Sequence, residues 1–264
     1  MTQVIPRPEG PDFVGVGVAK CATTWLGDVL AQHPEVLFAS DKEVNFFTRN
    51  FHRGYRWYHD HFRGKEGRLA GEISVNYIYS PRPDAMRKEF YPRWNPRRAL
   101  LFWRRMPSAR DELKARYPGL RVFAMFRNPV DRVWSHYWYW RNRKVRLRKG
   151  FVPFETMFAD DGRWIRLQGN YADLLAKWRE AFPDMGVFLY DDMRADPAAL
   201  ARSAYRFVGV DEGFAPTLSK KVNLGKYEPM PRQTRERLVE AYRDQVVRFA
   251  AMTGRDLSSW LDVK

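Results

Sequence analysis

The segment from residue 13 to 30, FVGVGVAKCATTWLGDVL, joins a short apolar run to a loop of small residues and then to an amphipathic run. The apolar run predicts a buried strand, and Thr23 or Thr24 stands where it caps a helix that ends at His33-Pro34. The N-terminus of that helix offers backbone N–H groups and a positive dipole, with Lys20 beside it as a point charge. This arrangement predicts an anion site that fits a phosphate or a sulfate.

The residue sequence of the loop differs from that of the common nucleotide-binding loop. The nucleoside-triphosphatase motif requires Gly-Lys-Ser/Thr directly before its helix, whereas here Lys20 is followed by Cys21-Ala22-Thr23. A related phosphotransferase that uses ATP stays an alternative, as does an ordinary strand-to-helix turn with a surface lysine. Cys21 is the only cysteine, which excludes an intrachain disulfide, and without a neighbouring His or Asn we expect it to fill space rather than to act as a nucleophile.

A second strand-to-helix junction carries an arginine. Residues 121–126 predict a buried strand, Arg127 follows at its end, and Asn128-Pro129 begins a helix. In open α/β sheets, ligands bind at the C-terminal edge of the strands. Ser135 falls on a different flank of the helix from the apolar residues, so its hydroxyl and the Arg127 guanidinium are able to serve one ligand. The alternative is that Arg127 pairs with a carboxylate while Ser135 faces solvent.

Strands and helices alternate along the chain without repeats, which predicts an α/β fold. We expect a single domain, 1–264, with a central, mainly parallel sheet flanked by helices. Further helices are predicted over 171–182 and 196–208, and a final one begins at Pro231. A Pro- and Arg-rich stretch at 91–108 is interpreted as an insertion, either a wall of the acceptor cleft or a surface flap that covers the sheet.

The charge of the chain bears on its partners. Lys and Arg number 46 against 31 Asp and Glu, a net charge of +15, and the clearest basic cluster lies at 141–149. A basic nucleic-acid- or polyanion-binding module is therefore an alternative, although no zinc-finger, RNP or helix-turn-helix pattern supports nucleic acid as a partner. No apolar run is long enough to cross a bilayer and the N-terminus lacks a signal core, so we expect a cytoplasmic protein; its oligomeric state is left open.

Both anion motifs resemble those of sulfotransferases that use 3′-phosphoadenosine 5′-phosphosulfate (PAPS). The first loop of that family binds the 5′-phosphosulfate, and the resemblance implies donor contacts from Lys20, Cys21, Ala22, Thr23, Thr24 and Trp25. Ala22 stands where the family usually has glycine. The second motif is similar to the 3′-phosphate-binding segment, which implies that role for Arg127 and Ser135. A late basic loop resembles the family's cover over the 3′-phosphate and adds Lys221 and Gly225.

The resemblance is closest to the branch of heparan-sulfate sulfotransferases and their bacterial relatives. In that branch a Glu-x-x-Phe-Phe segment supplies the catalytic base; residues 42–47, KEVNFF, match it, and an aromatic continuation follows at 51–62. The match implies that Glu43 is the general base. Glu72 is the second candidate, as a base or as an orienter of the acceptor or of Lys42, in a segment where Ile73 replaces a lysine of the family.

The resemblance also implies a fold and a reaction. The fold is the P-loop-like sulfotransferase fold, and the enzyme moves a sulfuryl group from PAPS to a hydroxyl or an amine, leaving adenosine 3′,5′-bisphosphate. Lys20 is expected beside the departing 5′-phosphate, and no metal is expected because cationic side chains and helix N–H groups neutralise the charge. The acceptor stays open among a carbohydrate, a glycolipid and a small phenolic or polyketide natural product.

Overall fold

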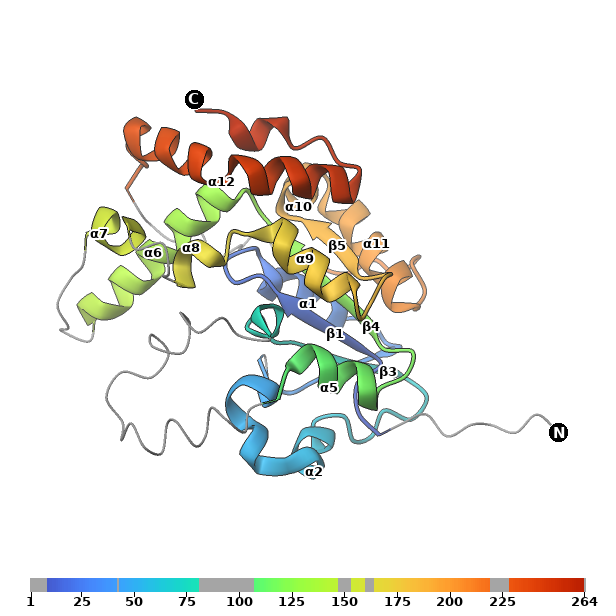
Figure 1. The fold of residues 1–264 in the computed structure, drawn as a ribbon. Coiled ribbons are helices and arrows are strands. Elements are labelled where there is room, and N and C mark those ends of the chain that lie inside the picture. Colours follow the sequence, from blue (N-terminus) through green and yellow to red (C-terminus); the bar gives the residue numbers. More distant parts are fainter. Residues whose placement is uncertain are drawn as a thin grey trace.

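The described part of the chain is built on one sheet of five strands (Figure 1). A computed structural model describes residues 9–41, 43–80, 107–146, 153–159, 164–218 and 228–263. The strand order is β2-β3-β1-β4-β5, and every neighbouring pair is parallel. The strands are β1 (Phe13–Gly17), β2 (Val36–Phe38), β3 (Leu69–Ile73), β4 (Arg121–Phe126) and β5 (Gly186–Leu189). The predicted α/β fold with a central parallel sheet is confirmed.

Helices cover both faces of the sheet (Figure 1). The α-helices are α1 (Thr23–Ala31), α2 (Gly54–Asp60), α5 (Ala109–Arg116), α6 (Pro129–Arg146), α7 (Phe154–Ala159), α8 (Trp164–Leu167), α9 (Tyr171–Arg179), α10 (Tyr190–Ala195), α11 (Pro197–Val208) and α12 (Arg232–Thr253). Short π and 3₁₀ turns are η1 (Phe46–Asn50), η2 (Phe51–Arg53), η3 (Tyr77–Tyr79) and η4 (Ser258–Leu261). No helix within the described ranges is long and apolar enough to cross a membrane.

Two phenylalanines of β4 show how the layers divide, because side chains of a strand alternate between its faces. Phe123 packs against Phe207 of α11 with ring centroids 6.0 Å apart. Phe126 faces Tyr171 of α9 and Phe249 of α12, at 5.0 and 4.7 Å. Helices α1 and α11 contact each other in one layer, and α9 and α12 contact each other in the other.

Two of the predicted helices, α11 and α12, begin where the sequence predicts. Helix α11 begins after Asp196, whose side chain accepts the Ala199 N–H at 2.9 Å, and α12 begins directly after Pro231. Helix α9 ends at Arg179, slightly earlier than expected. The insertion at 91–108 lies almost wholly outside the described residues, as do Lys42, Lys221, Gly225 and the end of the basic cluster at 147–149.

Candidate active site

The loop between β1 and α1 turns through two residues with left-handed backbone conformation. Lys20 has φ 73° and Ala22 has φ 62°, a region that residues with a Cβ adopt only at a cost. The Cys21 amide N–H between them donates to the Val18 carbonyl at 3.3 Å. The loop is therefore a tight, internally bonded turn that leads from the C-terminal edge of β1 to the start of α1.

Helix α1 begins with its positive end open. The prediction that Thr23 or Thr24 caps this helix is wrong, because Ala22 stands at the N-cap position and no side chain caps the N-terminus. The first turn has no acidic residue. The backbone N–H groups of Thr23, Thr24 and Trp25 consequently have no acceptor within the helix, and the dipole there favours a negative charge. Since the Trp25 indole is buried, this residue is able to serve an anion only through its backbone.

The two predicted anion motifs meet at the C-terminal edge of the sheet. The Val18 N–H donates to the Met125 carbonyl at 3.0 Å, and the backbone of Arg127 hydrogen-bonds the sulfur of Cys21. Burial raises the pKa of that thiol to about 11, so the thiol is neutral and packed at physiological pH. These contacts place the backbone of Arg127 next to the β1–α1 loop.

Helix α6 completes this edge with aromatic and polar side chains. Lys20 Nζ lies 4.8 Å from the centre of the Tyr139 ring, one helical turn beyond the buried Ser135. Just before α6, the Arg127 guanidinium lies 4.6 Å from the centre of the ring of Tyr190, the first residue of α10. Neither tyrosine was expected from the sequence, although the i, i+4 spacing from Ser135 is the signal that places Tyr139 on the same side of α6.

A buried arginine adds positive charge near the loop. Arg132 of α6 is fully buried and donates to the Ile165 carbonyl at 2.7 Å and to Gln168 Oε1 at 2.8 Å. No carboxylate of the described residues pairs with it, and its charge acts to lower the pKa of Cys21 against the larger effect of burial. Burial, followed by the charge of Arg132, holds the pKa of His136 well below its usual range. The positive potential of this region favours anions.

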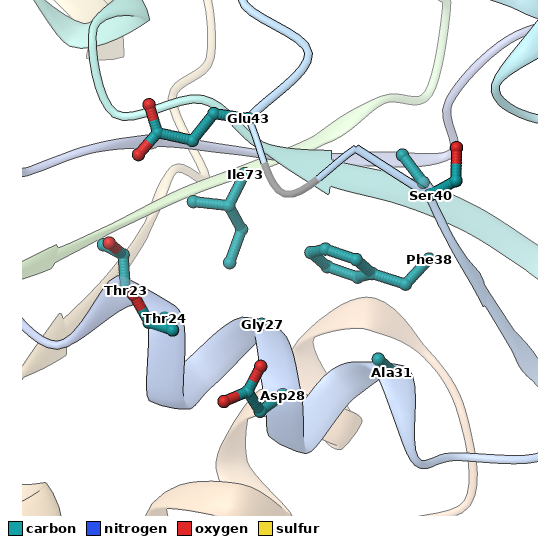
Figure 2. Close-up of a pocket in the computed structure, with 10 residues that line it drawn as sticks. Thr23, Thr24, Gly27, Asp28, Ala31, Phe38, Ser40, Glu43 and Ile73 are labelled. Atoms are coloured by element: carbon teal, nitrogen blue, oxygen red, sulfur yellow. The ribbon is translucent and has the colours of Figure 1, made fainter. Parts of the chain in front are cut away.

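A pocket of about 180 Å³ opens beside the start of α1. Figure 2 shows Thr23 and Thr24 on the helix and the Glu43 carboxylate across the pocket from them, on the segment that follows β2. Its lining residues are Thr23, Thr24, Gly27, Asp28, Ala31, Phe38, Ala39, Ser40, Glu43 and Ile73. The pocket therefore places a carboxylate opposite the uncapped N-terminus of α1.

The two carboxylates predicted for catalysis occupy different surroundings. Glu43 is partly exposed in the pocket, and its Oε2 accepts from the Asn45 side-chain amide at 3.3 Å. Glu72 has no exposed surface, is absent from the pocket lining, and accepts hydrogen bonds from three hydroxyl groups. No group of three or more His, Cys, Asp or Glu among the described residues is arranged to hold a metal ion.

Residues 11–215 match the profile of the sulfotransferase family. The chain belongs to that family. The sulfotransferase is 26% identical in sequence to a crystallised sulfotransferase from Alicyclobacillus acidocaldarius, with a TM-score of 0.74 over 96% of this chain and 99% of that one. The predicted resemblance to sulfotransferases is thereby confirmed, and the family match favours sulfuryl transfer over phosphoryl transfer.

Two relatives come from the heparan-sulfate branch. The sulfotransferase is 25% identical to human bifunctional heparan sulfate N-deacetylase/N-sulfotransferase 3, over 95% of this chain and 31% of the relative. It is 27% identical to mouse heparan sulfate glucosamine 3-O-sulfotransferase 3A1, over 93% of this chain and 63% of the relative. The chain thus spans about a third of the first relative's length and less than two thirds of the second's.

Proposed function

We propose that this sulfotransferase transfers a sulfuryl group from PAPS to a hydroxyl or an amine of a carbohydrate acceptor, with Glu43 as the general base. The observation that carries the proposal is the shared pocket: Glu43 faces the N-terminus of α1, where Thr23 and Thr24 begin the helix. A base and an anion-binding helix end on opposite sides of one small space suit the transfer of an anionic group to a nucleophile.

The residues of the loop and of α6 fit the donor. PAPS supplies the sulfuryl group; the N–H groups at the start of α1 and Lys20 would hold its 5′-phosphosulfate, and Arg127 and Ser135 its 3′-phosphate. Support comes from the absence of acidic residues in the first turn of α1 and from the contacts that join the loop to Arg127. Lys221 and Gly225 lie outside the described residues and stay predictions for the 3′-phosphate.

Each step of the transfer has a residue suited to it. Glu43 accepts the proton of the acceptor hydroxyl or amine as its oxygen or nitrogen forms a bond to sulfur. The bond from sulfur to the 5′-phosphate oxygen breaks, and Lys20 and the helix N–H groups stabilise the charge that develops on the departing phosphate. The partial exposure of Glu43 in the pocket allows contact with an acceptor, which complete burial denies to Glu72.

The pocket lining favours a carbohydrate as the acceptor. Phe38 and Ile73 make an apolar floor, whereas Asp28, Ser40 and Glu43 supply hydrogen-bonding groups around it. A sugar ring combines an apolar C–H face with polar edges, which suits such a mixed lining. The relatives whose names specify heparan sulfate as acceptor support the same class.

The experiment compares the wild type with Glu43→Gln and with Glu240→Gln, which removes an exposed carboxylate of α12. We expect Glu43→Gln to keep its affinity for adenosine 3′,5′-bisphosphate while sulfuryl transfer to amino sugars and oligosaccharides falls ~10²–10⁴-fold, the range for loss of a general base. Glu240→Gln should behave as wild type. Full activity in Glu43→Gln would refute the assignment of the base.

Titrations then test the donor itself. Adenosine 3′,5′-bisphosphate should bind more tightly than ATP with magnesium, and more tightly than duplex DNA at moderate salt, because only the bisphosphate fits both anion motifs. Tighter binding of ATP would point to the phosphotransferase alternative. Tight, strongly salt-dependent binding of DNA would point to the nucleic-acid-binding alternative.

A further inference from the structure

The fully buried carboxylate of Glu72 is the centre of a hydroxyl cluster. Its Oε1 accepts from the Tyr58 hydroxyl at 2.8 Å and from the Tyr77 hydroxyl at 3.0 Å, and its Oε2 accepts from Ser74 Oγ at 2.5 Å. Glu72 and Ser74 belong to β3 and the turn after it, Tyr77 to η3, and Tyr58 to α2. One carboxylate therefore joins three parts of the chain.

The cluster also holds the backbone of the segment that follows Glu43. The Val44 backbone hydrogen-bonds the carboxylate directly. The Asn45 N–H donates to Ser74 Oγ at 2.8 Å, and the Phe46 N–H donates to the Tyr77 hydroxyl oxygen at 2.7 Å. Three consecutive residues are thus anchored to one carboxylate, the first directly and the next two through a single hydroxyl each.

The residue in the middle of this anchored run, Asn45, also contacts the Glu43 side chain. Asn45 has a left-handed backbone, φ 50°, and its side-chain amide donates to the Glu43 carbonyl at 3.2 Å and to Glu43 Oε2 at 3.3 Å. The amide oxygen of Asn45 accepts from Thr48 Oγ1 and from the Asn76 side chain, both at 3.2 Å. With both ends of its amide bonded, Asn45 presents a fixed N–H donor to the Glu43 carboxylate.

We propose that Glu72 is a positioning residue that sets the place of Glu43 in the pocket by anchoring the backbone of residues 44–46. The inference rests on the proposed function, in which Glu43 acts as the base. Glu72 itself does not contact a ligand in the pocket, because its side chain is fully buried and is absent from the pocket lining. Its effect on the reaction passes through the chain that carries Glu43.

All three hydroxyl groups donate to the Glu72 carboxylate. Burial raises the pKa of Glu72, and the hydrogen bonds from Ser74, Tyr58 and Tyr77 act to lower it. Burial, followed by the nearby Glu72 charge, raises the pKa of Tyr58 and of Tyr77 well above the usual range, so both phenols stay protonated and donate. Each hydroxyl of Ser74 and Tyr77 then directs its proton to the carboxylate and its lone pairs to a backbone N–H. A neutral Gln at position 72 would bring an NH₂ group against these donors and disturb the anchored backbone.

A matched pair of variants isolates the role. Tyr77→Phe and Tyr58→Phe each keep the ring and remove one hydroxyl that donates to Glu72 Oε1, but only the Tyr77 hydroxyl also accepts a backbone N–H of the segment after Glu43. We expect Tyr77→Phe to lower kcat ~10–100-fold, since small misplacement of a reacting group costs rate in that range. The acceptor KM and the affinity for adenosine 3′,5′-bisphosphate should change little, and Tyr58→Phe should keep its kcat within about threefold.

Double variants test whether the effect passes through the base. In the Glu43→Gln background, Tyr77→Phe and Glu72→Gln should cause no further loss of kcat, because the group they position is gone. Equal kcat losses in Tyr77→Phe and Tyr58→Phe, or a full further loss in the Glu43→Gln background, would overturn the positioning role while leaving the proposed function intact. High activity of Glu43→Gln alone would overturn the base assignment and the positioning role together.

Discussion

The left-handed backbone at Ala22 predicts that glycine at this position stabilises the protein. With φ 62° and ψ 25°, the alanine bears a strain of ~1–2 kcal/mol that glycine lacks. Glycine in turn adds freedom to the unfolded chain, a cost of ~0.4–1 kcal/mol. The partly buried methyl group that packs against the core is lost as well, which costs up to ~0.4 kcal/mol for about half of a buried CH₂.

These contributions leave Ala22→Gly more stable by ~0.5 kcal/mol, a rise in Tm of ~1–2 °C for a chain of this size. The matched control is Ala251→Gly, the same change at an exposed position of α12, where glycine should lower the free energy of unfolding by ~1 kcal/mol. Urea and thermal unfolding of both variants should therefore differ by ~1.5 kcal/mol and ~3–6 °C. Equal destabilisation of the two variants would refute a left-handed Ala22 in solution.

Three further expectations concern the site. Arg127→Ala should weaken adenosine 3′,5′-bisphosphate binding by ~1.5–3 kcal/mol in calorimetry and leave adenosine 5′-monophosphate binding nearly unchanged, since only the former has a 3′-phosphate; equal losses would remove Arg127 from that phosphate. Asp28 lines the pocket and forms no ion pair with any described residue, so Asp28→Asn should lower kcat/KM for amine-bearing sugars relative to neutral ones, and an unchanged ratio would remove it from acceptor recognition. His136 stays neutral in the folded protein because burial and Arg132 lower its pKa. The unfolded imidazole gains a proton as the pH falls through ~6.5, so the wild type should lose ~1 kcal/mol more stability than His136→Gln between pH 7 and 5.5 in urea titrations; parallel pH profiles would contradict the buried neutral imidazole.

Local patterns in the sequence were sufficient to predict the strands and helices on either side of Lys20 and Arg127. The apolar run before Lys20 and the one before Arg127 are both buried strands, and both are followed at once by helices. Parallel strands present their C-terminal ends at one edge, so the alternation of strands and helices was sufficient to place both motifs at that edge. The contact between the Arg127 backbone and the Cys21 sulfur agrees with that reasoning.

The surroundings of the carboxylates could not be predicted in the same way. The sequence near Glu72 does not indicate whether this carboxylate is buried or partly exposed. Its partners Tyr58 and Tyr77 come from different elements and meet only in the folded chain. Arg132 was likewise not recognised, since burial of a charge depends on the packing of α6 against α8 and not on its neighbours along the helix.

The sequence by itself determined the hydrophobic period of each segment and the place of Lys20 and Arg127 after the ends of strands, because hydrophobic spacing and helix-end chemistry are local properties. Tertiary structure alone decided which carboxylate reaches a pocket and which is enclosed by hydroxyl groups. It also decided that the lysine of the first loop lies over a tyrosine of α6. Burial and contact at long separation arise from how the layers pack, and a linear pattern carries no direct measure of that packing.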